Sequence, residues 1–237
     1  MADDRLGEPT IPTSVIVRFH APPSAPYTTY RDCLRWEFAF HCAFCWLHEY
    51  DFAPTAHGSG RTGLFWIEHR ELRSHRADLL HVYSNCLWSC RFCNGARADR
   101  PCESHGATLL SPTEVAWADH FRLEAGNLLP LSDDADARYT HETYDLDDPR
   151  KVALRRDRAA RARELERAFA ELPPLLDRLL ERAAAGDRDC LLAAHEVQRV
   201  LRRASEDVSR MRVIPADAPT ACRCDAAGTL PAWAQST

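Results

Sequence analysis

The sequence predicts an α+β fold, in which a small core of strands and one helix is fastened by cysteines and is followed by a mainly α-helical C-terminal region. Two Cys-x-x-Cys pairs, at residues 42–45 and 90–93, bracket a run of aromatic and β-branched residues at 64–67 that is typical of a strand. From Pro149 onward the apolar residues recur at helical spacing, and Gly186 divides this helical stretch.

The composition is that of a globular protein whose charge is unevenly distributed. The 237 residues are 45% hydrophobic and 27% charged, with a formal net charge of −5. Residues 61–100 carry seven arginines and four acidic residues, and residues 150–212 carry sixteen cations and eleven acidic residues. Residues 133–148 hold seven acidic residues and one arginine. Basic patches suit a nucleic-acid partner, although residues 150–212 taken alone favour solvated helix faces.

Neither export nor membrane insertion is predicted. The chain has no run of roughly eighteen apolar residues, and its first residues, Met-Ala-Asp-Asp-Arg, are acidic and unlike a secretory signal. We therefore expect a cytoplasmic protein with no membrane partner. In that reducing location, the ten cysteines are expected to be metal ligands or free thiols before disulfides.

Composition shifts divide the chain into five predicted segments. They are an N-terminal arm at residues 1–29, the cysteine-fastened domain at 30–112, a hairpin and helix extension at 113–148, a helical region at 149–214 and a C-terminal tail at 215–237.

Within the cysteine-fastened domain, the pattern predicts two strands and two helices. The expected elements are a helix at 30–41 leading into the first cysteine pair, a glycine-rich loop at 51–63, a strand at 64–67 that ends at Glu68-His69, a second strand or tight connection at 82–88, and a short helix after Cys93.

Turn and breaker residues predict the remaining elements. Residues 121–131 alternate around Ala125-Gly126-Asn127 and predict a β-hairpin. The Pro173-Pro174 dipeptide cannot donate helical hydrogen bonds, so it is expected to break the helix that begins at Pro149. The predicted helices are 133–144, 149–172, 175–185 and 189–211.

The two cysteine pairs predict one shared structural zinc. Each Cys-x-x-Cys turn directs two sulfurs to one side, and two such turns supply the four soft ligands of a tetrahedral site. Four buried free cysteines would not require a repeated spacing, and a redox dithiol would be expected beside a βαβ pattern, which the sequence lacks. The expected ligands are Cys42, Cys45, Cys90 and Cys93. Buried or incidental thiols are expected at Cys33, Cys86, Cys102 and Cys190, and the role of Cys222 and Cys224 stays open.

The polar residues between the cysteine pairs follow a known order. An acid–histidine pair, Glu68-His69, is followed by Asn85 and then by Cys90-Arg-Phe-Cys93-Asn94, with Arg97 three residues further on. This order resembles the HNH endonucleases of the ββα-metal superfamily, and the resemblance covers about residues 30–100. It implies that residues 30–112 form a zinc-stapled HNH core, and that the protein is a phosphodiester hydrolase acting on DNA.

A looser similarity extends past this core. Residues 106–114 and 119–131 resemble a branch of HNH proteins that includes the nuclease partner of the ATPase in Septu-type anti-phage systems. This similarity implies a role in anti-phage defence with an ATPase subunit.

The resemblance assigns the catalytic roles. His69 would be the general base that takes a proton from the attacking water, while Glu68 and Asn94 would bind one divalent metal at the scissile phosphate. Carboxylate and amide oxygens are hard ligands, so Mg²⁺ or Mn²⁺ is the expected catalytic ion.

Three further residues receive supporting roles. Asn85 would brace the loop that orients His69, and Arg97 and Arg91 would contact nucleic acid, Arg97 through a neighbouring phosphate. The chain departs from the family pattern in having Glu rather than Asp at position 68, Asn rather than His at position 94, and Arg70-Glu71-Leu72 where a proline often follows.

Two interpretations remain open on the sequence. The first is a metal-dependent DNA endonuclease whose helices after Pro149 contact a partner, a second copy of the chain or DNA. The second is a catalytically silent zinc-stapled module that binds nucleic acid or protein. Taken singly, His69, Glu68 and Asn94 would be a surface ion pair, a strand-end charge and a helix cap. An aromatic cluster is expected in the core rather than as a base-stacking surface: Trp36, Phe38, Phe40, Phe44, Trp46, Phe65 and Trp66.

Overall fold

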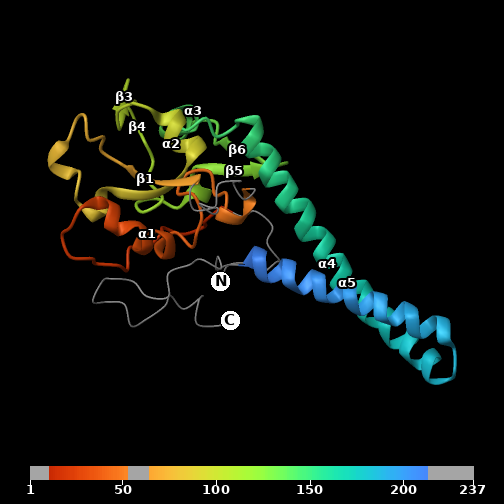
Figure 1. Ribbon diagram of the computed structural model, residues 1–237. Helices are drawn as coiled ribbons and strands as arrows, with labels where there is room; N and C mark the ends of the chain where they lie inside the picture. Colours follow the sequence, from red (N-terminus) through yellow and green to blue (C-terminus); the bar gives the residue numbers. More distant parts are fainter. Residues whose placement is uncertain (1–10, 53–63, 213–237) are drawn as a thin grey trace. The chain divides into compact units, whose positions relative to one another are not determined.

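The computed structural model describes residues 11–52 and 64–212 (Figure 1). Residues 11–52 and 64–156 form one compact unit, called the core unit below, and residues 157–212 form a second, helical unit. The fold is mixed α and β, with small antiparallel sheets and a C-terminal helical region, as the sequence predicts. Most of the glycine-rich loop and the predicted tail, with Cys222 and Cys224, lie outside the described residues.

The centre of the core unit is an antiparallel strand pair with a helix packed on it. Strand β1 (Phe65–His69) pairs with β2 (Cys86–Cys90) in a register that sets Phe65 opposite Cys90 and His69 opposite Cys86. Helix α2 (Arg91–Arg97) follows β2 without a break and contacts both strands. Helices α1 (Arg31–Glu37) and α2 lie on opposite sides of the pair (Figure 1). The two predicted strands and the helix are therefore present, although the second strand begins at Cys86 after a 3₁₀-helix at 83–85 instead of at residue 82, and α2 begins before Cys93.

A left-handed turn brings the first cysteine pair to this strand pair. After α1, Ala39 and Phe40 have φ angles of 47° and 60°, values that few residues other than glycine adopt. The turn reverses the chain, and the amide of Ala43 then donates to the carbonyl of Trp88 on β2 at 2.7 Å. This hydrogen bond ties the first Cys-x-x-Cys segment to the strand that leads into the second.

The predicted N-terminal arm is packed along the core unit from Ile11 onward. The amide of Ile16 donates to Pro112, and the amide of Ala118 donates to Pro12. Arg18 forms an ion pair with Glu37 at 2.6 Å and also donates to backbone carbonyls at the start of β2. This segment, which those contacts hold against the rest of the unit, ends in the short 3₁₀-helix η1 (Tyr27–Tyr30).

Short elements complete the core unit. They are the 3₁₀-helices η2 (Glu49–Asp51), η4 (Ala77–Leu79), η5 (Tyr83–Asn85) and η6 (Trp117–Asp119), the hairpin of β3 (Glu103–Ser104) and β4 (Ala107–Thr108), the hairpin of β5 (Phe121–Glu124) and β6 (Asn127–Pro130), and helix α3 (Ala135–Thr143). The second hairpin turns at Ala125 and Gly126, both with positive φ, as its sequence predicts. A Cβ at Gly126 would lie 2.7 Å from Arg156 Cγ, so glycine is required there.

The helical unit contains one correction to the predicted elements. Helix α4 (Pro149–Ala184) runs through Pro173 and Pro174, so the predicted break at this dipeptide is wrong. The prolines remove two helical donors, but Ala170 and Pro174 are exposed, which leaves water able to reach this turn. Gly186, with φ of 99°, does separate α4 from α5 (Arg188–Arg212), as predicted.

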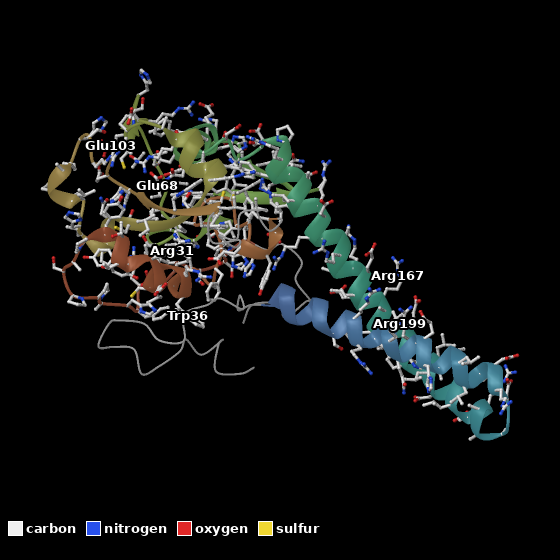
Figure 2. The ribbon with its side chains drawn as sticks, viewed as in Figure 1. Arg31, Trp36, Glu68, Glu103, Arg167 and Arg199 are labelled. Atoms are coloured by element: carbon white, nitrogen blue, oxygen red, sulfur yellow. The ribbon has the colours of Figure 1, made fainter. Side chains whose placement is uncertain are left out.

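The helical unit has a thin apolar seam and charged outer faces. Ala162 and Leu165 of α4 pack against Ala204 of α5. Arginines such as Arg167 and Arg199 project from the two helices (Figure 2). Among the described residues, no helix is both long enough and apolar enough to cross a membrane.

Candidate functional site

The four predicted zinc ligands meet in the buried centre of the core unit. Their sulfurs all lie within 4.8 Å of one another, and each of the four residues is 0% exposed. The strand register explains the meeting, because Cys90 ends β2 beside the segment that Ala43 ties to Trp88. The ligands are Cys42, Cys45, Cys90 and Cys93.

The donor set and its dimensions fit zinc. Zinc–sulfur bonds of about 2.3 Å in a tetrahedron place sulfurs about 3.8 Å apart, and the Sγ atoms of Cys45 and Cys90 are separated by 3.6 Å. Burial alone would raise the pKa of Cys42, but hydrogen bonds from the neighbouring thiols hold it well below its ordinary value. A divalent ion can replace the protons that such closely packed thiols share.

The only lysine of the sequence lies close to this cluster. Burial alone would lower the pKa of Lys151, but the cluster sulfurs, with Cys93 foremost, raise it. Its ammonium is fully buried and donates to the carbonyls of Tyr144 and Asp145 at 2.5 and 2.7 Å. Lys151 therefore places a positive charge near four sulfurs that are negative when they bind metal. No sequence motif includes Lys151, although its isolation in an arginine-rich chain is a signal.

A cleft of about 580 Å³ follows β1 and is lined by three of the four predicted catalytic residues, with Asn85 outside it. Four consecutive residues, Trp66 to His69, line it from the strand, and Asn94 lines it from α2. The structure thus brings Glu68, His69 and Asn94 to one cavity beside the cysteine cluster.

The imidazole of His69 is held in one tautomer. Its Nε2 lies 3.0 Å from the carbonyl oxygen of Leu80, and because a carbonyl can only accept, Nε2 carries the proton. Nδ1 is then the ring nitrogen with the free lone pair. Burial lowers the pKa of His69 below its ordinary value, so the neutral ring predominates at neutral pH.

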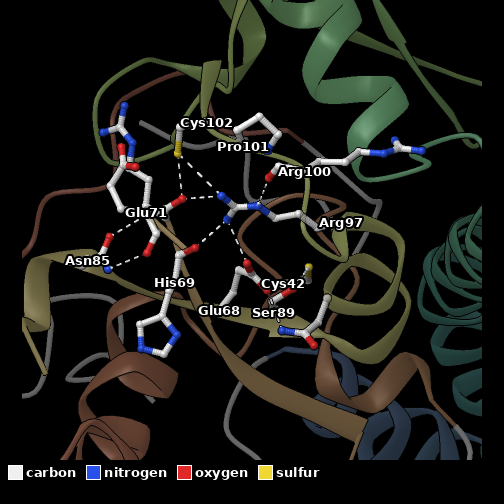
Figure 3. A network of polar contacts seen from close by, with 12 residues as sticks. Cys42, Glu68, His69, Glu71, Asn85, Ser89, Arg97, Arg100, Pro101 and Cys102 are labelled. Carbon is white, nitrogen blue, oxygen red and sulfur yellow. Dashed lines mark hydrogen bonds and ion pairs between the residues drawn. The ribbon is translucent and has the colours of Figure 1, made fainter. Parts of the chain in front are cut away.

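Asn85 holds the loop that carries Leu80. Its Oδ1 accepts from the amide of Glu71 at 2.7 Å, and its Nδ2 donates to the carbonyl of Glu71 at 3.0 Å (Figure 3). Nδ2 also donates to the carbonyl of Leu79 at 3.2 Å. The side chain is buried and lies outside the cleft lining. Asn85 therefore contacts both ends of the loop whose Leu80 carbonyl fixes His69.

The two predicted ligands of a catalytic metal contact each other. Asn94 Nδ2 donates to Glu68 Oε2 at 2.5 Å. Burial raises the pKa of Glu68 to about 7, although the Arg97 guanidinium opposes this rise. A carboxylate and an amide at this separation can share one cation, provided that the Asn94 amide rotates to present its oxygen. The donor set fits Mg²⁺ or Mn²⁺ in chemical type.

Arg97 does not lie where a phosphate contact was predicted. It is 0% exposed, and its guanidinium donates to Glu68 Oε1 at 2.8 Å, to the carbonyls of His69 and Arg70, and to the sulfur of Cys102 (Figure 3). The predicted nucleic-acid contact is therefore wrong for this residue. A sequence signal was present, because Arg97 follows the zinc ligand Cys93 by four residues and so shares its buried helix face.

Arg91, the other predicted nucleic-acid contact, is exposed and lines the cleft. Arg73, which the sequence analysis did not single out, also lines it and is exposed. Neither arginine has a carboxylate partner within residues 11–52 and 64–205. Both are therefore available to a negatively charged ligand.

Tyr27 was missed by the sequence analysis. It lines the cleft from η1, and its ring packs edge-on against His69 with centroids 4.8 Å apart. The same ring stacks on His81 at 6.0 Å, and the Tyr27 amide lies 3.3 Å from His81 Nδ1. No local pattern could have revealed this contact, because it joins segments that are distant in sequence.

Comparisons of the chain with protein-family models, with curated proteins and with solved structures give no match. Functional assignment therefore depends on the residues of the cleft and of the cysteine cluster themselves.

Proposed function

We propose that the protein is a metal-dependent HNH endonuclease that hydrolyses phosphodiester bonds in DNA. The observation that carries the proposal is the fixed tautomer of His69, whose side chain lines the same cleft as Glu68 and Asn94. A general base, an acidic ligand and an amide ligand are the groups that metal-assisted hydrolysis of a phosphodiester requires.

The proposed chemistry assigns one task to each group. Nδ1 of His69 removes a proton from the water whose oxygen forms the new bond to phosphorus, and the bond from phosphorus to the leaving oxygen breaks. Glu68 and Asn94 hold a Mg²⁺ or Mn²⁺ ion, which neutralises charge on the phosphate and on the leaving oxygen when it is bound. The lowered pKa of His69 supports its role, because the ring is neutral and able to accept a proton at pH 7.

The cysteine cluster has a structural role in this proposal. It lies between the strand pair and the first Cys-x-x-Cys segment, and a zinc there would fix β2 and the start of α2 relative to the rest of the core unit. The looser resemblance to Septu-type proteins supports a partner ATPase and a role in anti-phage defence.

Plasmid cleavage tests the proposal. Purified protein is incubated with supercoiled plasmid and Mg²⁺ or Mn²⁺, and the wild type is compared with His69→Ala and with His75→Ala. His75 is an exposed histidine of the loop that follows β1 and does not line the cleft, so its removal controls for general loss of a histidine. The proposal predicts nicking by the wild type and His75→Ala but not by His69→Ala. Equal nicking by all three would refute the assignment of His69.

One observation favours the second candidate function, a catalytically silent binding module. Both oxygens of Glu68 are already engaged, one by Arg97 and the other by Asn94. If these contacts persist with Mn²⁺ present, Asn94 presents its Nδ2 and not its oxygen to Glu68, and the two residues do not share a catalytic ion. Plasmid binding without nicking by any of the three proteins would then support the binding module.

A further inference from the structure

One side chain of the cleft departs from the expected aromatic core. Trp66 is 45% exposed, whereas its neighbour Phe65 is 0% exposed. Because residues alternate along a strand, Trp66 shares a strand face with Glu68, two residues away. Within residues 11–52 and 64–205, Trp66 has no ring contact. It therefore presents an exposed indole at the cleft, on the side of the strand that carries the proposed metal ligand.

Helix α2 lines the cleft with an open, positively charged surface. Arg91, Gly95 and Ala98 all line the cleft at helical spacing. A Cβ added at Gly95 would meet no atom within 4 Å, so nothing bulky stands above this part of α2. The guanidinium of Arg91 packs over the ring of Phe92, 4.8 Å from its centroid, and its donors form no hydrogen bond within residues 11–52 and 64–205. This surface of α2 therefore offers the Arg91 cation and room for a sugar-phosphate backbone.

The charge of the cleft favours phosphate. Arg73 and Arg91 lack carboxylate partners among the described residues, while the charge of Glu68 is balanced by Arg97. Asp99 is the remaining acidic residue of the lining. Two guanidinium groups and the Asp99 carboxylate, none of them in an ion pair among the described residues, thus line the cleft beside an exposed indole.

We propose that the cleft binds a single-stranded nucleic acid, with an unpaired base stacked on Trp66 and the adjoining phosphate paired with Arg91. An aromatic face takes up a base whose own face is free, which is the state of bases in a single strand and not inside a duplex. A duplex would offer its backbone and base edges, which an exposed indole does not recognise. The proposal rests on the nuclease function only in placing the scissile phosphate at His69, because the binding itself needs no catalysis.

Fluorescence anisotropy tests this subsite without cleavage. Zinc-loaded protein in buffer free of Mg²⁺ and Mn²⁺ is titrated into fluorescein-labelled oligonucleotides of one sequence, as single-stranded DNA, single-stranded RNA and duplex DNA. The variants are Trp66→Ala, Trp66→Phe and Trp66→Leu, and circular dichroism and zinc content check that each is folded. We expect tighter binding of a single strand than of the duplex, about tenfold weaker binding by Trp66→Ala, and near wild-type binding by Trp66→Phe.

The leucine and arginine variants separate stacking from general contact. Trp66→Leu keeps apolar area but loses the ring, so it should bind as weakly as Trp66→Ala. Arg91→Ala should reduce the slope of log affinity against log salt by about 0.7, the effect of one lost phosphate contact on a single strand. Weaker binding by Trp66→Ala than by the wild type, with either the DNA or the RNA strand, supports the subsite. The strand that the wild type binds more tightly identifies the preferred sugar.

The outcomes distinguish this subsite from the nuclease proposal. Wild-type binding by Trp66→Ala, or tighter binding of the duplex, would overturn the subsite even if His69→Ala abolishes nicking. Loss of binding in Trp66→Ala would uphold the subsite even if no protein nicks plasmid.

Discussion

His69 Nε2 lies 3.0 Å from the carbonyl oxygen of Leu80, and this hydrogen bond decides which ring nitrogen can act as a base. The carbonyl belongs to a loop that Asn85 holds at Glu71 and Leu79. The Leu80 carbonyl therefore orients the imidazole, although Leu80 does not itself line the cleft. The imidazole also packs edge-on against the ring of Tyr27, on the segment before α1.

Substitution of Asn85 tests the loop. Asn85→Ala leaves the part-buried amide of Glu71 and the carbonyl of Leu79 without these partners, at a cost of about 1–3 kcal/mol in the free energy of unfolding. Nicking should fall as well, because the Leu80 carbonyl loses its fixed position. Thermal unfolding and plasmid nicking measure the two effects. Unchanged stability together with unchanged nicking would show that the loop does not depend on Asn85.

Substitution of Tyr27 separates positioning from stability. Tyr27→Ala removes the ring that packs against His69, and we expect kcat to fall by about tenfold to a hundredfold with little change in KM. Tyr27→Phe retains the ring and should restore most of the activity. Steady-state kinetics on a labelled oligonucleotide give both constants. A loss confined to KM, or no recovery with phenylalanine, would contradict a role in holding the imidazole.

Arg97 and Arg91 lie on the same helix, α2, but Arg97 is buried and Arg91 is exposed, so their substitutions can be compared. Arg97→Ala leaves the carboxylate of Glu68 buried without its cation, which typically costs about 3–5 kcal/mol. Arg91 is exposed and has no carboxylate partner among the described residues, so Arg91→Ala should leave the unfolding temperature almost unchanged. Differential scanning calorimetry compares the two. Equal destabilisation by both substitutions would contradict the buried role of Arg97.

Loss of a cluster cysteine should cost both zinc and folding. Elemental analysis of the wild type should give one zinc per chain. Cys42→Ser should lose the zinc and much of the stability, because metal binding supplies folding free energy in such sites. Cys190→Ser is the control, since Cys190 lies outside the cluster and its sulfur contacts Asp187. A folded Cys42→Ser protein with full zinc content is the result that the cluster assignment does not allow.

The raised pKa of Glu68 predicts that metal binding in the cleft depends on pH. With a pKa of about 7, Glu68 is mostly protonated at pH 6 and mostly ionised at pH 8. The ionised form is the ligand, so Mn²⁺ affinity of the zinc-loaded protein should rise about tenfold from pH 6 to pH 8. Isothermal titration calorimetry at the two pH values measures this. Glu68→Gln should bind Mn²⁺ weakly at both, and an identical pH dependence in that variant would assign the effect to another group.

Local sequence patterns predicted the elements that depend on local chemistry. The spacing of Cys42 with Cys45 and of Cys90 with Cys93 predicted their cluster, and the alternation around Ala125-Gly126 predicted the hairpin. The hairpin depends on a turn conformation that a short segment determines by itself, and the cluster depends on a ligand spacing that is repeated in two segments.

The features that sequence analysis missed depend on which way a side chain points or on distant segments. Arg97 occupies a motif position, but its helix face turns it towards Glu68 and the protein interior. Trp66 lies in an apolar run but faces the cleft because of strand alternation. Tyr27 reaches His69 only through the packing of the N-terminal segment. The helix break predicted at Pro173-Pro174 is wrong, because α4 continues through both prolines at a turn that water can reach.

The most direct test of the nuclease proposal is an anomalous difference map from crystals of the zinc-loaded protein soaked in Mn²⁺. The proposal predicts two peaks, a zinc peak among the four cysteine sulfurs and a manganese peak bound by a carboxylate oxygen of Glu68 and by Asn94 Oδ1, on the cleft side facing His69. A single zinc peak, with Asn94 still donating to Glu68 in the presence of saturating Mn²⁺, would contradict it.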